Sequence, residues 1–113
     1  MPQQVWVPFV DKHPHAHLVS GVCSPGDGSK IDRSRLLARL VVALHPTGAY
    51  AVQTTRDRDL TLVQCAFEKN EDAEKFGQMV QAQINGHYPG WASQRTFMFD
   101  AGATGAINTV LAR

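Results

Sequence analysis

Hydrophobic and polar residues are patterned most clearly in the middle of the chain. The run Leu60–Phe67 is apolar at six of its eight positions, which is typical of a strand that is covered on at least one face and central in a sheet. In the residues that follow, apolar positions repeat at steps of three and four, as they do on one face of a helix. That helical set is Ala73, Phe76, Val80 and Ile84. The pattern therefore predicts a central strand followed by an amphipathic helix that covers it.

Small and polar residues set the expected limits of that helix. Asn70 is predicted to cap its start, because the Asn side-chain oxygen can accept a first-turn N–H. Asn85-Gly86 is predicted to end it, because both residues tolerate a left-handed backbone. Gly77 lies inside the helix, where the missing side chain would allow close packing onto the sheet.

The rest of the chain divides into shorter elements. Residues 36–44 carry a second helical stripe, and His45-Pro46 is predicted to end that helix. Alternating patterns predict strands at 16–22, 50–55 and 94–99, and the charged link 56–59 predicts a hairpin into the central strand. Val5–Val10 is predicted to be a short edge strand, because Pro8 cannot donate to a ladder. Gly105–Arg113 is predicted to form a short closing helix.

This order of elements predicts a ferredoxin-like α+β fold. Strand, helix, strand, strand, helix, strand is the split βαβ arrangement (βαββαβ), with an extra N-terminal edge strand and a short C-terminal helix. Residues 1–113 are expected to form one domain, since a chain of 113 residues supports one core. Two helices would cover one face of the sheet, and the other face would be open.

Composition and charge exclude several classes of protein. Hydrophobic residues make up 43% of the chain and charged residues 19%, as in folded domains generally. The net charge of +1 gives no broad attraction to nucleic acid or to an anionic membrane, and we expect neither as a partner. The start of the chain lacks a signal-peptide pattern, and no apolar run approaches the roughly 20 residues that span a bilayer. We therefore expect a cytoplasmic protein.

Three histidines form the sharpest chemical pattern. His13, His15 and His17 alternate along the chain, and on a strand such residues could present imidazoles to one metal ion. Zinc or nickel would be the expected ion, with Asp11 or a distant histidine completing the site. Surface histidines on an exposed strand explain the same pattern without a metal, and Pro14 interrupts the strand.

A second cluster lies in the segment HYPGWASQR. Tyr88, Trp91 and Arg95 are residue types that anchor binding surfaces, and loops often carry function. The same residues also suit a loop that folds back to seal the edge of a core. For Trp91 we favour the sealing role.

Other chemistry has little support. The loop SPGDGSK precedes a helix and could expose N–H groups to phosphate, but Asp27 stands where a P-loop needs lysine. Cys23 has histidines upstream and could form a Cys–His pair, but we favour a partly buried, inert thiol. No GxSxG or CxxC motif is present.

These patterns favour a small non-catalytic domain that acts by protein–protein contact. We expect it to form a homodimer through its open sheet face. The alternative is a metal- or small-ligand-binding protein that uses His13, His15 and His17. A third hypothesis is an enzyme with its site between the sheet and the HYPGWASQR loop.

Overall fold

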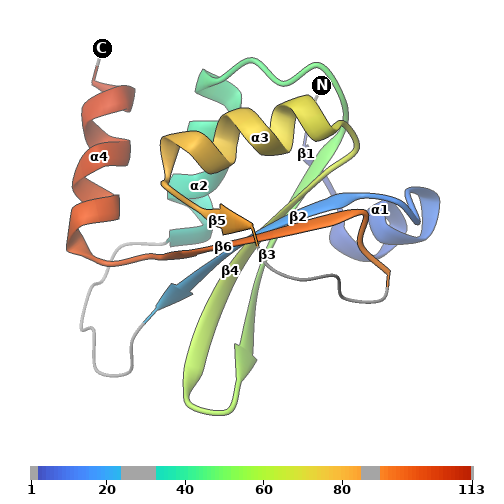
Figure 1. Cartoon of the computed structure of the whole chain (residues 1–113), viewed down its shortest axis with the longest axis horizontal. Coiled ribbons are helices and arrows are strands. Elements are labelled where there is room, and N and C mark those ends of the chain that lie inside the picture. The colour runs from blue at the N-terminus through green and yellow to red at the C-terminus, as the bar shows by residue number, and fades with distance from the viewer. Residues whose placement is uncertain (1–2, 24–32, 85–89, 113) are drawn as a thin grey trace.

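The computed structural model describes residues 3–23, 33–84 and 90–112, which fold as an α+β domain around a mixed sheet (Figure 1). Six described strands lie in the order β1-β3-β4-β2-β6-β5. The strands are β1 (Gln3–Gln4), β2 (His17–Cys23), β3 (Tyr50–Asp57), β4 (Leu60–Phe67), β5 (Gln83–Ile84) and β6 (Ser93–Met98). The described helices are α1 (Trp6–Lys12), α2 (Arg33–Ala43), α3 (Asn70–Met79) and α4 (Ala101–Leu111).

Strand β4 has the predicted bounds and lies between β3 and β2, both antiparallel to it. Its alternate residues Val63, Cys65 and Phe67 are fully buried on one face. The prediction of a central strand is therefore confirmed, and so is the hairpin from β3, in which Asp57 pairs with Leu60.

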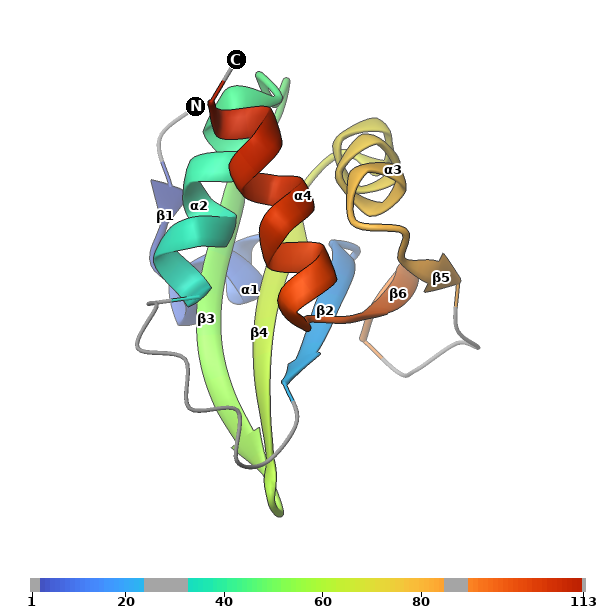
Figure 2. The same cartoon turned by 90° about the vertical axis from the view of Figure 1, so that its left-hand side faces the viewer.

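Helices α2, α3 and α4 cover one face of the sheet, whereas α1 lies on the other (Figure 2). The main core fills the space under the three helices. It includes four of the five predicted members of the α2 stripe, Leu36, Leu37, Leu40 and Val41, and the fifth, Leu44, is partly buried against them. The loop 24–30, with Asp27, lies outside the described residues.

Helix α3 is shorter than its apolar pattern predicts. It ends at Met79, where Gln81 takes a left-handed backbone (φ 58°) and the Ala82 N–H donates to the Gly77 carbonyl at 2.8 Å. These are the marks of a Schellman ending, which usually has glycine where Gln81 stands. Ile84 therefore leaves the helix and lies in β5, 76% exposed. The predicted cap is also shifted by one residue, because Lys69 is the N-cap and makes no side-chain bond.

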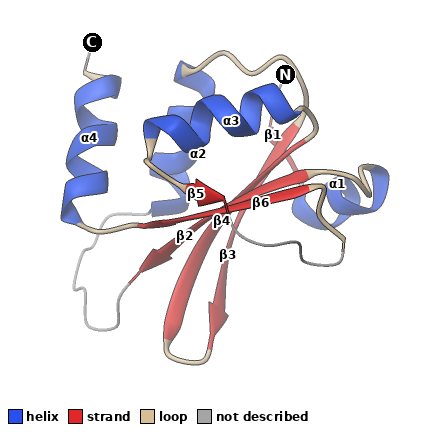
Figure 3. Cartoon of the chain, viewed as in Figure 1, coloured by secondary structure: helices blue, strands red, loops and turns tan. Residues whose placement is uncertain are grey.

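The ferredoxin-like topology is not what the sheet shows. The strand order includes the outer strands β1 and β5, and β6 runs parallel to β2. In a split βαβ arrangement neighbouring strands run antiparallel. The direction of β6 is reversed relative to the prediction because β5 lies between α3 and β6 in the chain. Strand β5 pairs antiparallel with β6, so the chain changes direction between the two strands (Figure 3).

The predicted edge strand at Val5–Val10 is wrong, because these residues belong largely to helix α1. Pro8 lies in its first turn, where a backbone N–H has no partner within the helix and proline is tolerated. Phe9 is buried against Ala51 and Ala66, and Trp6 and Val10 pack beside it. Strand β1 takes the edge instead and pairs with the start of β3.

The closing helix is longer than predicted. Helix α4 begins at Ala101, and the Asp100 side chain caps it by accepting from the Ala103 N–H at 2.9 Å. Gly102 and Gly105 disfavour helix in the sequence pattern. The cap and the burial of Ile107 in the main core outweigh that preference.

Candidate functional site

The three predicted metal ligands lie in three different settings. His13 follows α1, where its ring centroid is 4.6 Å from that of Phe9 and its Nδ1 is 3.8 Å from Glu68 Oε2. His15 is exposed in a turn, and only His17 belongs to β2. The alternation of a strand therefore does not apply to all three histidines. Within the part of the chain that the structure describes, no three His, Cys, Asp or Glu residues are grouped to hold a metal ion.

The predicted binding cluster is divided by the sheet. Trp91 packs with Phe9 and Trp6 on the α1 side, and the two tryptophan ring centroids are 6.0 Å apart. Arg95 lies opposite Val19 in the register, on the side covered by α3. Tyr88 lies outside the described residues. Trp91 therefore lies as the sealing role requires, and Arg95 belongs to a separate group.

That group is a hydrogen-bonded chain of Arg95, Ser93 and His17. The Arg95 Nη1 donates to Ser93 Oγ at 3.1 Å, and Ser93 Oγ lies 2.8 Å from His17 Nδ1. A guanidinium can only donate, so the serine hydroxyl accepts from Arg95 and is free to donate its own hydrogen to His17. When the hydroxyl donates in this way, His17 Nδ1 accepts, and the imidazole is neutral with its hydrogen on Nε2.

The electrostatics agree with this assignment of hydrogens. Burial and the positive charge of Arg95 both lower the pKa of His17 below its ordinary value. Each effect disfavours the charged form of a histidine. Sequence reasoning missed this contact because Ser93 and His17 are 76 residues apart, and only the parallel β2–β6 register brings them together.

The stem of Arg95 passes directly beneath α3. A Cβ atom built on Gly77 would lie 2.9 Å from Arg95 Cδ, closer than side chains pack. The predicted role of Gly77 in close packing is therefore confirmed. Arg95 is only 8% exposed as a result.

The opposite face of the sheet carries a ladder of polar side chains. Gln53 Nε2 donates to Gln64 Oε1 at 2.7 Å, and Gln64 Nε2 donates to Ser20 Oγ at 3.1 Å. Thr96 continues the row in the register on β6. We call these four residues the glutamine ladder. Gln64 and Thr61 are the two polar residues of β4. The position of Gln64 in the middle of this apolar strand is the sequence signal for the ladder.

An apolar row lies beside the glutamine ladder, two residues further along each strand and further from α1. It crosses the strands in register as Leu62, Val22 and Met98, with the polar Thr55 at its β3 end. Met98 is 57% exposed. No other described helix or strand covers the glutamine ladder and this row, which together form what we call the uncovered face.

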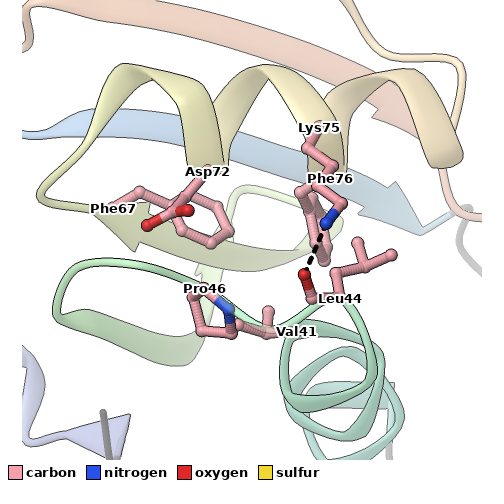
Figure 4. Close-up of a pocket in the computed structure, with 7 residues that line it drawn as sticks. All are labelled: Val41, Leu44, Pro46, Phe67, Asp72, Lys75 and Phe76. Atoms are coloured by element: carbon pink, nitrogen blue, oxygen red, sulfur yellow. Dashed lines mark hydrogen bonds between the residues drawn. The ribbon is translucent and has the colours of Figure 1, made fainter.

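In the two pockets that adjoin α3 the carboxylates already accept from backbone N–H groups, whereas a third pocket, of about 200 Å³ beside α1, is lined by Lys12, His13 and Glu68. One, between α2 and α3, measures about 10 Å³ and has room for a single water (Figure 4). Its carboxylate, Asp72, already accepts from the Thr47 and Gly48 N–H groups. A wider hollow of about 430 Å³ lies between the end of α3 and the start of α4. Asp100 is its only ionisable residue, and that side chain caps α4.

The two cysteines are buried and apart from any base. Cys23 and His17 occupy opposite ends of β2, about 20 Å apart at the rise of a strand. Cys65 is fully buried, and this burial strongly raises the pKa of its thiol. Neither thiol has the exposure of a nucleophile, so the structure does not support a Cys–His pair.

Comparison of the chain with protein-family models, curated proteins and solved structures found no match. Among the described helices, none has the length and apolar character needed to cross a membrane. Function is therefore inferred from the geometry of the chain itself.

Proposed function

We propose that this chain is a non-catalytic interaction domain that forms a homodimer through the uncovered face of its sheet. The observation that carries the proposal is the pairing of the glutamine ladder with the apolar row beside it. Protein interfaces combine an apolar core with polar groups that already have hydrogen-bond partners. The two rows supply both features on adjacent lines of one face of the sheet.

The glutamine ladder supports burial in an interface. Burying an amide without a partner is costly, whereas an amide already bonded within its own chain loses less on desolvation. Gln64 both accepts and donates within the ladder, and Ser20 is already 4% exposed. A partner that covered this row would leave few new polar groups unpaired.

The absence of charge on the two rows favours a second copy as the occupant. Neither the ladder nor the apolar row contains Asp, Glu, Lys or Arg. A strongly charged partner would gain no complementary contact there, whereas two copies could meet without like-charge repulsion. The β3–β4 hairpin projects past the helices, which would allow two sheets to pack face to face (Figure 1).

Light scattering coupled to size exclusion, over a concentration series, tests the proposal. We expect a dimer in the micromolar range, and we expect Met98→Glu to weaken it at least tenfold by placing a charge in the apolar row. Val42→Glu is the matched control. The exposed fraction of Val42, 59%, is similar to the 57% of Met98, but Val42 lies on α2, on the other side of the sheet. A wild-type monomer at several hundred micromolar, or equal effects of the two variants, would refute the proposal.

A further inference from the structure

We infer that Arg95, Ser93 and His17 form a binding site for a small oxyanion, such as a phosphate or a carboxylate group. This site lies under α3, on the side of the sheet away from the uncovered face. It does not depend on dimer formation, so either proposal can fail without the other.

The positive charge of Arg95 favours the binding of an anion. The residue is 8% exposed and its side chain donates to one neutral hydroxyl, that of Ser93. None of its other guanidinium nitrogens is a buried atom without a partner, so the remaining donors of its five N–H groups reach solvent and are open to a ligand. No described Asp or Glu forms an ion pair with it, since the ion pair found among the described residues joins His13 and Glu68. An oxyanion would supply the missing negative charge and accept two of the free donors.

The segment that carries Arg95 supplies no counter-ion of its own. Residues 85–89, which connect β5 to the segment before β6, are Asn, Gly, His, Tyr and Pro. From Val80 to Phe99 the chain contains no Asp or Glu at all. The cation is therefore not neutralised by its own or its neighbouring segment.

Packing alone does not explain the arginine. Its aliphatic stem fills the space beneath Gly77, and a methionine would fill the same space without a buried charge. A guanidinium in this position adds nothing to the apolar contact. What it adds is a set of donors beside a hydroxyl and an imidazole.

The hydrogen-bonded chain can also adapt to an anion. Ser93 can turn its hydrogen from His17 Nδ1 toward a bound oxygen, and His17 can then hold a proton on Nδ1. The anion would cancel the field of Arg95 that disfavours charge on His17. Binding of an anion would therefore raise the pKa of His17, and a purely structural arginine would not produce that change.

The test is an NMR titration of the His17 ring against pH, with and without inorganic phosphate and at constant ionic strength set with chloride. We expect phosphate to raise the pKa of His17 by about 1, the scale of a nearby charge. Arg95→Met should abolish that rise. Arg58→Met, which removes an exposed hairpin arginine, is the matched control and should retain it.

Ser93→Ala provides a second variant should Arg95→Met fail to fold, because it keeps the stem and the charge. We expect it to weaken phosphate binding at least threefold. The inference is wrong if phosphate at tens of millimolar leaves His17 unchanged in the wild type. It is equally wrong if chloride produces the same rise, if the rise persists in a folded Arg95→Met, or if Ser93→Ala gives the rise at the same phosphate concentration as the wild type.

Discussion

The turn after α2 depends on one buried carboxylate, and its removal should be costly. Asp72 is 7% exposed in the first turn of α3. Its two oxygens accept from the Thr47 N–H at 3.0 and 3.1 Å, and Oδ2 also accepts from the Gly48 N–H at 2.9 Å. The side chain therefore fixes α3 to residues 47–48, just before β3 begins.

The expected magnitude follows from those bonds. Hydrogen bonds to charged groups contribute about 1.5–3 kcal/mol each. Loss of both in Asp72→Ala would leave two backbone N–H groups without their acceptor, so we expect a loss of about 3–5 kcal/mol in the free energy of unfolding. Asp72→Asn keeps one acceptor oxygen and loses the charge, and we expect about half that loss.

Urea unfolding at equilibrium, followed by tryptophan fluorescence, measures the series. Thr47→Ala is the matched control, because its hydroxyl lies closer to Glu71 Oε1, at 3.0 Å, than to Asp72 Oδ1, at 3.3 Å. Removal of that exposed hydroxyl should leave the backbone bonds intact and cost less than about 1 kcal/mol. A loss below about 0.5 kcal/mol for Asp72→Ala, within the range of ordinary surface substitutions, would refute the reasoning.

Three further predictions concern the core and the His17 site. Gly21→Ala should destabilise the fold by about 1–3 kcal/mol, because its Cβ would lie 2.6 Å from Phe97 Cζ, and Phe97→Leu should recover part of the loss in a double-mutant cycle. Cys65 should resist a thiol reagent in the folded protein and react only after unfolding, since burial both shields it and raises its pKa; rapid labelling in native buffer would contradict this. Because the pKa of His17 is lowered in the folded state, the unfolded chain takes up its proton first as the pH falls, so stability should decrease below about pH 6.5 and less steeply in His17→Gln; equal slopes in urea titrations at pH 7 and 5 would count against it.

The elements that the sequence predicted well are those whose burial has a strong period. Strand β4 and helix α2 each bury one face in the main core, so their apolar residues recur without interruption. The sequence pattern predicts a strand where α1 forms, because the helix is short and proline is typical of an edge strand as well as of a first helical turn. The end of α3 was missed because Gln81 occupies a backbone conformation that usually selects glycine.

Pairings between distant segments could not be predicted from local patterns. The direction of β6 depends on the two-residue strand β5, which has no recognisable signal of its own. That direction decides which residues of β6 stand beside β2. With β6 parallel, His17 pairs with Ser93, and Val19 with Arg95. In an antiparallel pairing the same strand would place other side chains beside His17.

The position of Arg95 therefore depends on the direction of β6, which the ferredoxin-like prediction had antiparallel to β2 and which is parallel to it in the structure. Alternation along β6 places Arg95 and Phe97 on the same side, and both are buried under the helices. An apolar side chain in place of Arg95 would also fit beneath Gly77. The chain instead has a glycine in α3 directly above a positively charged side chain of β6. Substitution at either position alone changes the packing, whereas substitution of Ser93 changes only the polar contacts, so Ser93 is where the two roles of Arg95 can be separated.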